Sequence, residues 1–185
     1  MGQKGTETRD RLLTATQELI ETGGYYGAGL NQVIAASGAP RGSLYFHFPG
    51  GKDQLVGESV RRAGQSIEVA LGGLADSDPS VTDLVHGVLR YLGDRLEESG
   101  WRNGCPVATV ALETAAVNDP LQEACSEVYT SWEAALRVQL TGSPDAEDLA
   151  VTILALVEGA LLLARAHRSR EPLDRVARQV GVLLS

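Results

Sequence analysis

The sequence predicts an all-α protein, because helical periodicity and helix-boundary signals account for nearly all of its 185 residues. Apolar residues recur at spacings of three and four, and glycines or prolines mark the ends of these stretches. No convincing strand pattern, repeat or low-complexity tract interrupts them. The hydrophobic share of 43% is typical of a soluble globular protein with a real core.

The first predicted helix ends at Gly23-Gly24, and two short helices follow between Asn31 and Lys52. Ser37-Gly38 supplies a turn between the short helices, because Gly38 can adopt the positive φ that ends a helix. Pro40 is expected to open the second short helix at its first position, where a missing N–H costs no hydrogen bond. This order predicts a helix-turn-helix. The apolar positions of the first helix are Leu12, Ala15, Thr16, Leu19 and Ile20, and those of the next are Val33, Ile34 and Ala36.

The second short helix displays a dense polar and aromatic cluster that is suited to DNA. It is too short for much stability of its own, so its value must lie in what it presents. An arginine fits guanine edges or phosphate oxygens, and Ser, Tyr and His side chains suit phosphate contacts. Leu44, Phe46 and Phe48 are expected to hold the helix against its neighbours. The DNA-contacting residues that we expect are Asn31, Arg41, Ser43, Tyr45, His47 and Lys52.

Six further helices are predicted from Lys52 onward. The first begins at Lys52 and is a mechanical link, because it leaves the DNA-binding segment and enters the rest of the chain. Ser80 with Asp83 resembles a capping box before the second, which carries apolar residues to Leu96. The others run from Pro106 to about Val117, from Asp119-Pro120 to Leu140, and from Ser143-Pro144 to about Arg168, and a last helix follows Glu171-Pro172.

The segment Gly42-Ser43-Leu44-Tyr45-Phe46-His47-Phe48, followed by Lys52, resembles the signature of the TetR family of bacterial transcriptional regulators. The resemblance implies a three-helix DNA-binding domain over residues 1–51 and a helical regulatory and dimerisation domain over residues 52–185. The stretches Phe48-Pro49-Gly50-Gly51-Lys52 and Gly104-Cys105-Pro106 are similar to the LmrA-like branch. One departure is Ala28-Gly29, where family members often have Thr-Ser, so capping of the next helix falls to Gly29 or Asn31.

The charge distribution is uneven, with a formal net charge of −8. Residues 1–52 hold five basic and four acidic residues, a net +1, which leaves 11 basic and 20 acidic residues, a net −9, in the remainder. A nearly neutral DNA-binding segment binds DNA weakly as a single copy. Tight binding then requires two copies together with contacts to bases.

Polar, aromatic and thiol side chains among apolar neighbours predict a ligand site in the larger part of the chain. The candidates are His86, Trp101, Cys105, Glu113, Tyr129 and Trp132. Cys125 shares a helical stripe with apolar residues and is predicted to be a small buried residue. Cys105 precedes a helix N-terminus, where a thiolate is stabilised, so redox sensing stays open.

The last two helices predict a homodimer. The helix that contains Ile153 to Ala164 is apolar around most of its circumference, more than one intramolecular face requires. With the final helix it suggests a four-helix bundle between subunits, as in the family that the chain resembles. The stretch from Leu149 to Ala166 is the only candidate membrane span, but Thr152, Glu158 and Arg165 interrupt it, which favours a buried helix. Two cysteines and no leader pattern indicate cytoplasmic residence.

We therefore expect a ligand-responsive regulator of transcription that binds operator DNA, with the repressor sign and the small-molecule effector implied by the resemblance. An enzyme that uses Cys105, His86 and Glu113 is disfavoured, because nothing in their spacing requires it and no phosphate loop, metal-ligand cluster or hydrolase motif accompanies them. No cofactor is expected. A helical small-molecule-binding or Cys105-based redox-sensing protein without operator-specific binding is the alternative. The effector, the operator and the sign of regulation are left open.

Overall fold

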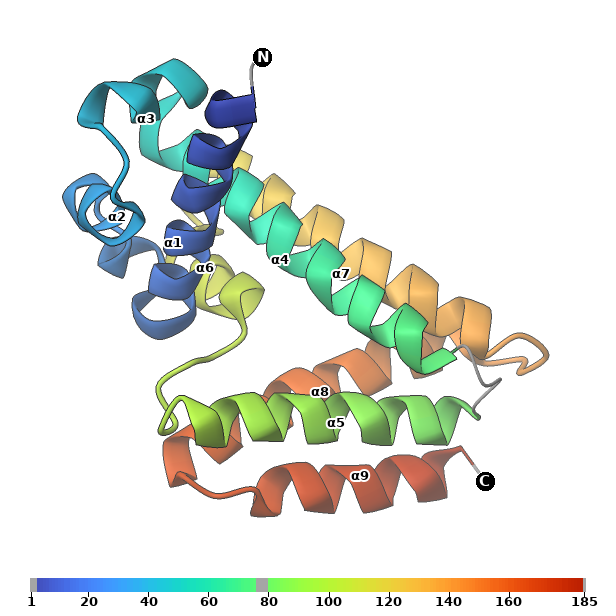
Figure 1. The fold of residues 1–185 in the computed structure, drawn as a ribbon. Coiled ribbons are helices and arrows are strands. Elements are labelled where there is room, and N and C mark those ends of the chain that lie inside the picture. Colours follow the sequence, from blue (N-terminus) through green and yellow to red (C-terminus); the bar gives the residue numbers. More distant parts are fainter. Residues whose placement is uncertain (1–2, 76–79, 185) are drawn as a thin grey trace. The chain divides into compact units, whose positions relative to one another are not determined.

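The computed structural model describes residues 3–75 and 80–184, and within these ranges all regular structure is helical (Figure 1). This confirms the all-α prediction. The helices are α1 Gln3–Gly27, α2 Leu30–Ser37, α3 Arg41–His47, α4 Gly51–Ala75, α5 Val81–Glu98, α6 Pro106–Thr114, α7 Asp119–Gln139, α8 Ala146–His167 and α9 Glu171–Leu183.

The chain divides into two compact units. We call Met1–Gly64 with Pro106–Val128 the head unit, and Gln65–Cys105 with Tyr129–Ser185 the body unit. The head unit therefore contains α6 and the first parts of α4 and α7, in addition to α1, α2 and α3. These units describe how the helices pack. The predicted division into a DNA-binding domain, residues 1–51, and a regulatory domain, residues 52–185, concerns function and stays a prediction.

The core of the head unit is built where α1, α2, α3 and the start of α4 meet. Phe48 and Leu44 are fully buried in it, as predicted, but the expectation for Phe46 is wrong, because its side chain is 73% exposed. Residues 44 and 48 are one helical turn apart and share a face, whereas residue 46 lies on the opposite side. The buried cluster comprises Leu12, Leu13, Val33, Ala39, Leu44, Phe48 and Leu55.

Most helix boundaries follow the local signals in the sequence. Gly38 has φ 61° and ends α2, as predicted, and its N–H donates to the carbonyl of Ile34. Pro40 occupies the N-cap of α3 and not its first helical position. The first helix does not stop at Gly23-Gly24 but continues to Gly27 through a kink at Gly24, with φ 64°. Helix α6 ends at Thr114, three residues earlier than predicted.

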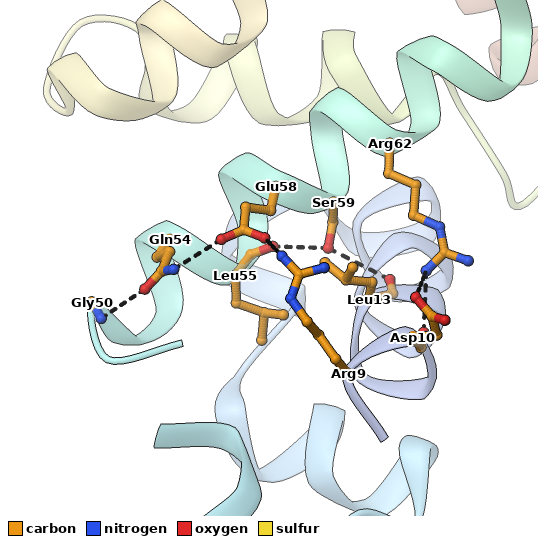
Figure 2. A network of polar contacts seen from close by, with 9 residues as sticks. All are labelled: Arg9, Asp10, Leu13, Gly50, Gln54, Leu55, Glu58, Ser59 and Arg62. Atoms are coloured by element: carbon orange, nitrogen blue, oxygen red, sulfur yellow. Dashed lines mark hydrogen bonds and ion pairs between the residues drawn. The ribbon is translucent and has the colours of Figure 1, made fainter. Parts of the chain in front are cut away.

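Polar contacts fasten the first half of α4 to α1 (Figure 2). Arg9 of α1 forms an ion pair with Glu58 of α4, and Gln54 donates to the same carboxylate at 2.8 Å. Ser59 donates to the carbonyl of Leu55 at 2.8 Å and lies 3.5 Å from that of Leu13. One turn later, Arg62 donates to the carbonyl of Asp10 at 3.2 Å. These contacts make residues 51–64 of α4 a structural part of the head unit.

The first half of α7 packs closely on α4. A Cβ added at Gly64 would lie 2.5 Å from Cγ1 of Val128, and one at Gly57 would lie 3.7 Å from Leu121 and Ala124. Arg61 forms an ion pair with Glu127 at 2.5 Å. Gly64 therefore lets the two helices approach within the head unit, whereas a Cβ at Gly57 would make only ordinary van der Waals contacts.

In the body unit, α5, α8 and α9 pack against one another (Figure 1). Ser80 caps α5 as predicted, because its Oγ accepts from the N–H of Asp83 at 3.1 Å. Arg170 contacts Asp94 at 2.6 Å and Glu97 at 3.0 Å, which ties the start of α9 to α5. By length and composition α8 could cross a membrane, a test that core helices of soluble proteins also pass. Its buried residues are Ala150, Ile153, Val157, Ala160, Leu161 and Ala164.

Candidate nucleic-acid interface

The outward face of α3 is the side opposite the buried Leu44. Arg41, Gly42, Tyr45 and Phe46 are exposed on it, and Ser43 is half-buried at its edge. The helix is positioned from within, because Leu44 and Phe48 are fully buried. Helix α3 has only seven residues, which is about two turns. The burial of Leu44 and Phe48 on one side therefore fixes the directions of its other side chains.

The polar groups of this face have no hydrogen-bond or ion-pair partner among residues 3–75 and 80–184. In the part of the chain that the structure describes, no hydrogen bond or ion pair holds the side chains of Arg41, Ser43 and Tyr45. Asn31 of α2 is exposed and also lacks a side-chain partner there; the N-cap of α2 is Gly29, without a side-chain capping bond. A guanidinium, an amide and two hydroxyls are therefore available to a ligand outside the protein.

His47 is half-buried between aromatic neighbours. Its ring lies edge-on to Phe46, with 5.0 Å between ring centroids, and 6.4 Å from the ring of Phe48. Its Nδ1 is buried and has no hydrogen-bond partner among the described residues. A phosphate contact by His47 would therefore have to use Nε2.

The sequence groups Lys52 with the polar side chains of α3, but in the structure it contacts the tyrosines at the end of α1. Its Nζ sits 3.8 Å from the ring centroid of Tyr25 and 5.9 Å from that of Tyr26, in cation–π geometry. Burial lowers the pKa of Lys52, and the nearby carboxylates of Asp53 and Glu113 oppose that shift. Lys52 is thus held by the protein itself.

Asp53 is the centre of what we call the seam, which joins the end of α1, the start of α4 and the connection between α6 and α7. Its Oδ1 accepts from the Tyr25 hydroxyl at 2.7 Å, and its Oδ2 accepts from the Asn118 amide at 2.9 Å. Burial, followed by the hydrogen bond to Asp53, raises the pKa of Tyr25 to about 12. Asn118 in turn accepts from the N–H of Leu121 in the first turn of α7 at 3.2 Å.

Glu113 belongs to the head unit and also contacts the end of α1. Its Oε2 accepts from the backbone N–H of Tyr26 at 3.1 Å. The positive φ of 64° at Gly24 favours glycine at the kink, and a Cβ added there would lie 2.6 Å from Oε1 of Glu113, so the flexible carboxylate would have to move. The contact that the structure gives Glu113 is therefore structural, and a ligand contact by Glu113 stays a prediction.

The other five predicted ligand residues lie in the body unit. His86 Nε2 is 2.8 Å from the carbonyl oxygen of Ala177, which joins α5 to α9. Trp101 adopts a positive φ of 64° in the turn after α5. Tyr129 and Trp132 contact each other edge-on, with 5.7 Å between centroids, and Trp132 is buried. The structure thus brings two of the five into ring contact and gives His86 a structural partner.

Cys105 is buried and hydrogen-bonds to Glu158, a residue that the sequence reasoning did not select. Burial raises the pKa of the Glu158 carboxyl, and the hydrogen bond from the Cys105 thiol partly offsets the rise. The sequence did contain a feature that could have identified Glu158, because it is the only carboxyl group within the apolar stretch from Leu149 to Ala164. Cys125 is buried as predicted, and burial raises its pKa to about 11.

Two family models match the chain. Residues 12–58 match the bacterial regulatory proteins of the tetR family, and residues 82–179 match the C-terminal domain of LmrA/YxaF-like transcriptional regulators. The second match lies in the part of the chain where the Gly104-Cys105-Pro106 signal stands. Both matches agree with the resemblance carried by α3 and the segment after it.

Individual proteins agree with these matches. The HTH-type transcriptional regulator LmrA of Bacillus subtilis is 36% identical, over 96% of this chain and 97% of its own length. The HTH-type transcriptional repressor DhaR of a Mycobacterium species is 25% identical, over 92% and 88%. A TetR transcriptional regulator from Chloroflexus aurantiacus, a solved structure, is 25% identical and superposes with a TM-score of 0.81 over 98% of this chain and 96% of its own.

The identity to LmrA along nearly the whole of both chains, together with the two family models, excludes a chance likeness of the helix-turn-helix alone. The same matches exclude the hypothesis of an enzyme that uses Cys105, His86 and Glu113, because the matched family consists of transcriptional regulators. The chain belongs to the TetR family of helix-turn-helix transcriptional regulators, with a C-terminal domain of the LmrA/YxaF-like type.

Proposed function

We propose that the protein is a cytoplasmic, homodimeric repressor that binds operator DNA through α3 and is released by a small-molecule effector. The observation that carries the DNA-binding half is the outward face of α3, where Arg41, Ser43 and Tyr45 are positioned but have no partner in the described structure. Asn31 and His47 extend this surface, and Lys52 joins it only if its ammonium can leave the ring of Tyr25. Residues 1–51 are the proposed DNA-binding domain.

Two features support a dimer. Residues 1–52 carry a net charge of only +1, so one copy offers little attraction to phosphates and two copies are needed for tight binding. In addition, α8 and α9 expose apolar side chains that a lone subunit would leave in water. These are Val151, Leu162, Leu163, Val182 and Leu183, with exposed fractions from 42% to 67%. The proposed interface is an intersubunit four-helix bundle of α8 and α9.

The effector site is proposed in residues 52–185, with Trp101, Cys105, Tyr129, Trp132, His86 and Glu113 as the residues to test. The repressor sign is supported by the name of the relative DhaR and stays part of the proposal. An effector that prefers the released form a hundredfold weakens operator binding by at most about 2.7 kcal/mol, and operator DNA weakens effector binding equally.

The test begins by selecting duplexes that bind the full-length protein from a random pool. If Arg41 reads a base, Arg41→Ala weakens binding to the selected duplex by about 1 to 3 kcal/mol, roughly 5- to 150-fold, and changes binding to a scrambled duplex little. Arg137→Ala, an exposed arginine of α7, is the matched control at the same salt concentration. Equal affinity of Arg41→Ala and the natural protein for the selected duplex would remove Arg41 from the readout.

The dimer is tested with Leu163→Glu, which would bury a charge in the proposed bundle. This variant should sediment as a monomer and bind the operator more weakly than the natural protein. A screen of small molecules against the protein–operator complex then tests release. A compound that binds the protein but leaves operator affinity unchanged at saturation would refute release by that compound.

A further inference from the structure

Phe46 is a large apolar side chain held out from the head unit. It is 73% exposed, although it follows Leu44 and precedes Phe48, which are both fully buried. With about 100° of rotation per helical residue, Phe46 and Gly42 both lie close to 180° from Leu44. They are one turn apart and form the centre of the outward face, with Arg41 and Tyr45 on one side of them and Ser43 on the other.

The ring of Phe46 is supported on one edge by an aromatic neighbour. It packs edge-on against His47, with 5.0 Å between centroids, and His47 is itself half-buried beside Phe48. A supported ring loses little conformational freedom when it is covered by a ligand. This arrangement favours a specific contact over accidental exposure of an apolar residue.

Gly42 is the second unusual feature of this centre. A Cβ there would have no atom within 4 Å, and its φ is not positive, so neither packing nor backbone conformation requires glycine. Glycine is nevertheless among the least favourable residues within a helix. Its effect is to leave space on the outside of α3, next to the ring of Phe46.

We propose that Phe46 is a specificity-determining residue that packs against the C5-methyl group of a thymine in the major groove, with Gly42 leaving room for the neighbouring base edge. The inference rests on the proposed function and adds to it a base preference that hydrogen-bonding residues do not supply. The thymine methyl is the apolar group that the major groove offers. Arg41 and Tyr45, exposed on the same face, suit the polar groups around it.

The test uses the selected operator and replaces each thymine in turn with deoxyuridine, which removes only the methyl group. For the natural protein, one such replacement in a half-site should weaken binding about threefold to tenfold, on the order expected for burying one methyl group. Phe46→Ala should weaken binding to the unmodified operator by a similar factor and lose its sensitivity to that replacement. The two losses are therefore not additive.

Leu112→Ala is the matched control, because Leu112 is 79% exposed on α6 of the same unit. It should keep the full response to deoxyuridine. Urea unfolding of both variants should match the natural protein, since neither side chain is buried. Gly42→Ala should weaken operator binding without lowering stability.

Full operator affinity of Phe46→Ala, or an unchanged deoxyuridine response in that variant, would overturn the inference. A change in oligomeric state with intact DNA binding would also overturn it, because the ring would then serve a protein contact. Failure to select any specific duplex would refute the proposed function itself, so the two failures are distinguishable.

Discussion

The outward face of α3 and the seam around Asp53 draw on the same kinds of side chains, basic, hydroxyl and aromatic, within one compact unit. On α3, Arg41 and Tyr45 have no partner in the described structure. In the seam, Tyr25 donates to Asp53 and carries the ammonium of Lys52 over its ring. The difference is whether the side chain's interactions are satisfied by the protein or left for a ligand.

This comparison divides the residues that the signature places together. Lys52 stands only a few residues after α3 in sequence, yet its contacts belong to the seam. Asp53, directly after it, connects α4 to α1 and to Asn118 before α7. Loss of a seam residue should therefore affect stability, whereas loss of an outward residue should affect DNA binding alone.

The largest effect is expected for Asp53→Ala. This change leaves the Tyr25 hydroxyl and the Asn118 amide without their acceptor in a partly buried site, which should destabilise the protein by about 2 to 4 kcal/mol. Urea unfolding of the unliganded protein measures it. Glu18→Ala, an exposed carboxylate of α1, is the control and should change stability by less than about 0.5 kcal/mol. Similar stabilities for the two variants would show that Asp53 does not stabilise the seam.

A smaller loss is expected for Gly64→Ala. The added Cβ would lie 2.5 Å from Val128, and overpacking of about 1 to 3 kcal/mol should exceed the gain of up to about 1 kcal/mol from replacing a helical glycine. Calorimetry should show a lower melting temperature. Gly42→Ala is the control, because its Cβ meets no atom and the variant should be slightly stabilised. The second substitution Val128→Ala should relieve the clash, and no relief would place the cause elsewhere.

The smallest effect on stability is expected for Lys52→Ala. Removing an ammonium from a partly buried cation–π contact should cost about 1 kcal/mol. Arg41→Ala should leave stability unchanged and weaken only operator binding. Parallel unfolding and binding measurements on both variants separate the two groups. If Lys52→Ala keeps full stability but binds operator less tightly at low salt, Lys52 belongs with the outward face after all.

Local signals in the sequence predicted much of the fold. Gly38 ends α2 through a positive φ and Ser80 caps α5, because both depend only on neighbours a few residues away. The fold class and the motif of α3 were predicted for the same reason. The burial of Leu44 and Phe48 was predicted correctly, and their spacing of four residues already implied that Phe46 points elsewhere.

The tertiary structure alone decided which polar side chains are used by the protein. Glu113 contacts the backbone of Tyr26, 87 residues earlier in the chain, and Asn118 contacts Asp53, 65 residues earlier. Periodicity places each residue on a face of its own helix but does not specify which distant helix that face meets. For that reason the sequence supplied the candidates for DNA and ligand contact, while packing between distant segments assigned Lys52 and Glu113 to contacts with the end of α1 and left Arg41, Tyr45 and Phe46 exposed.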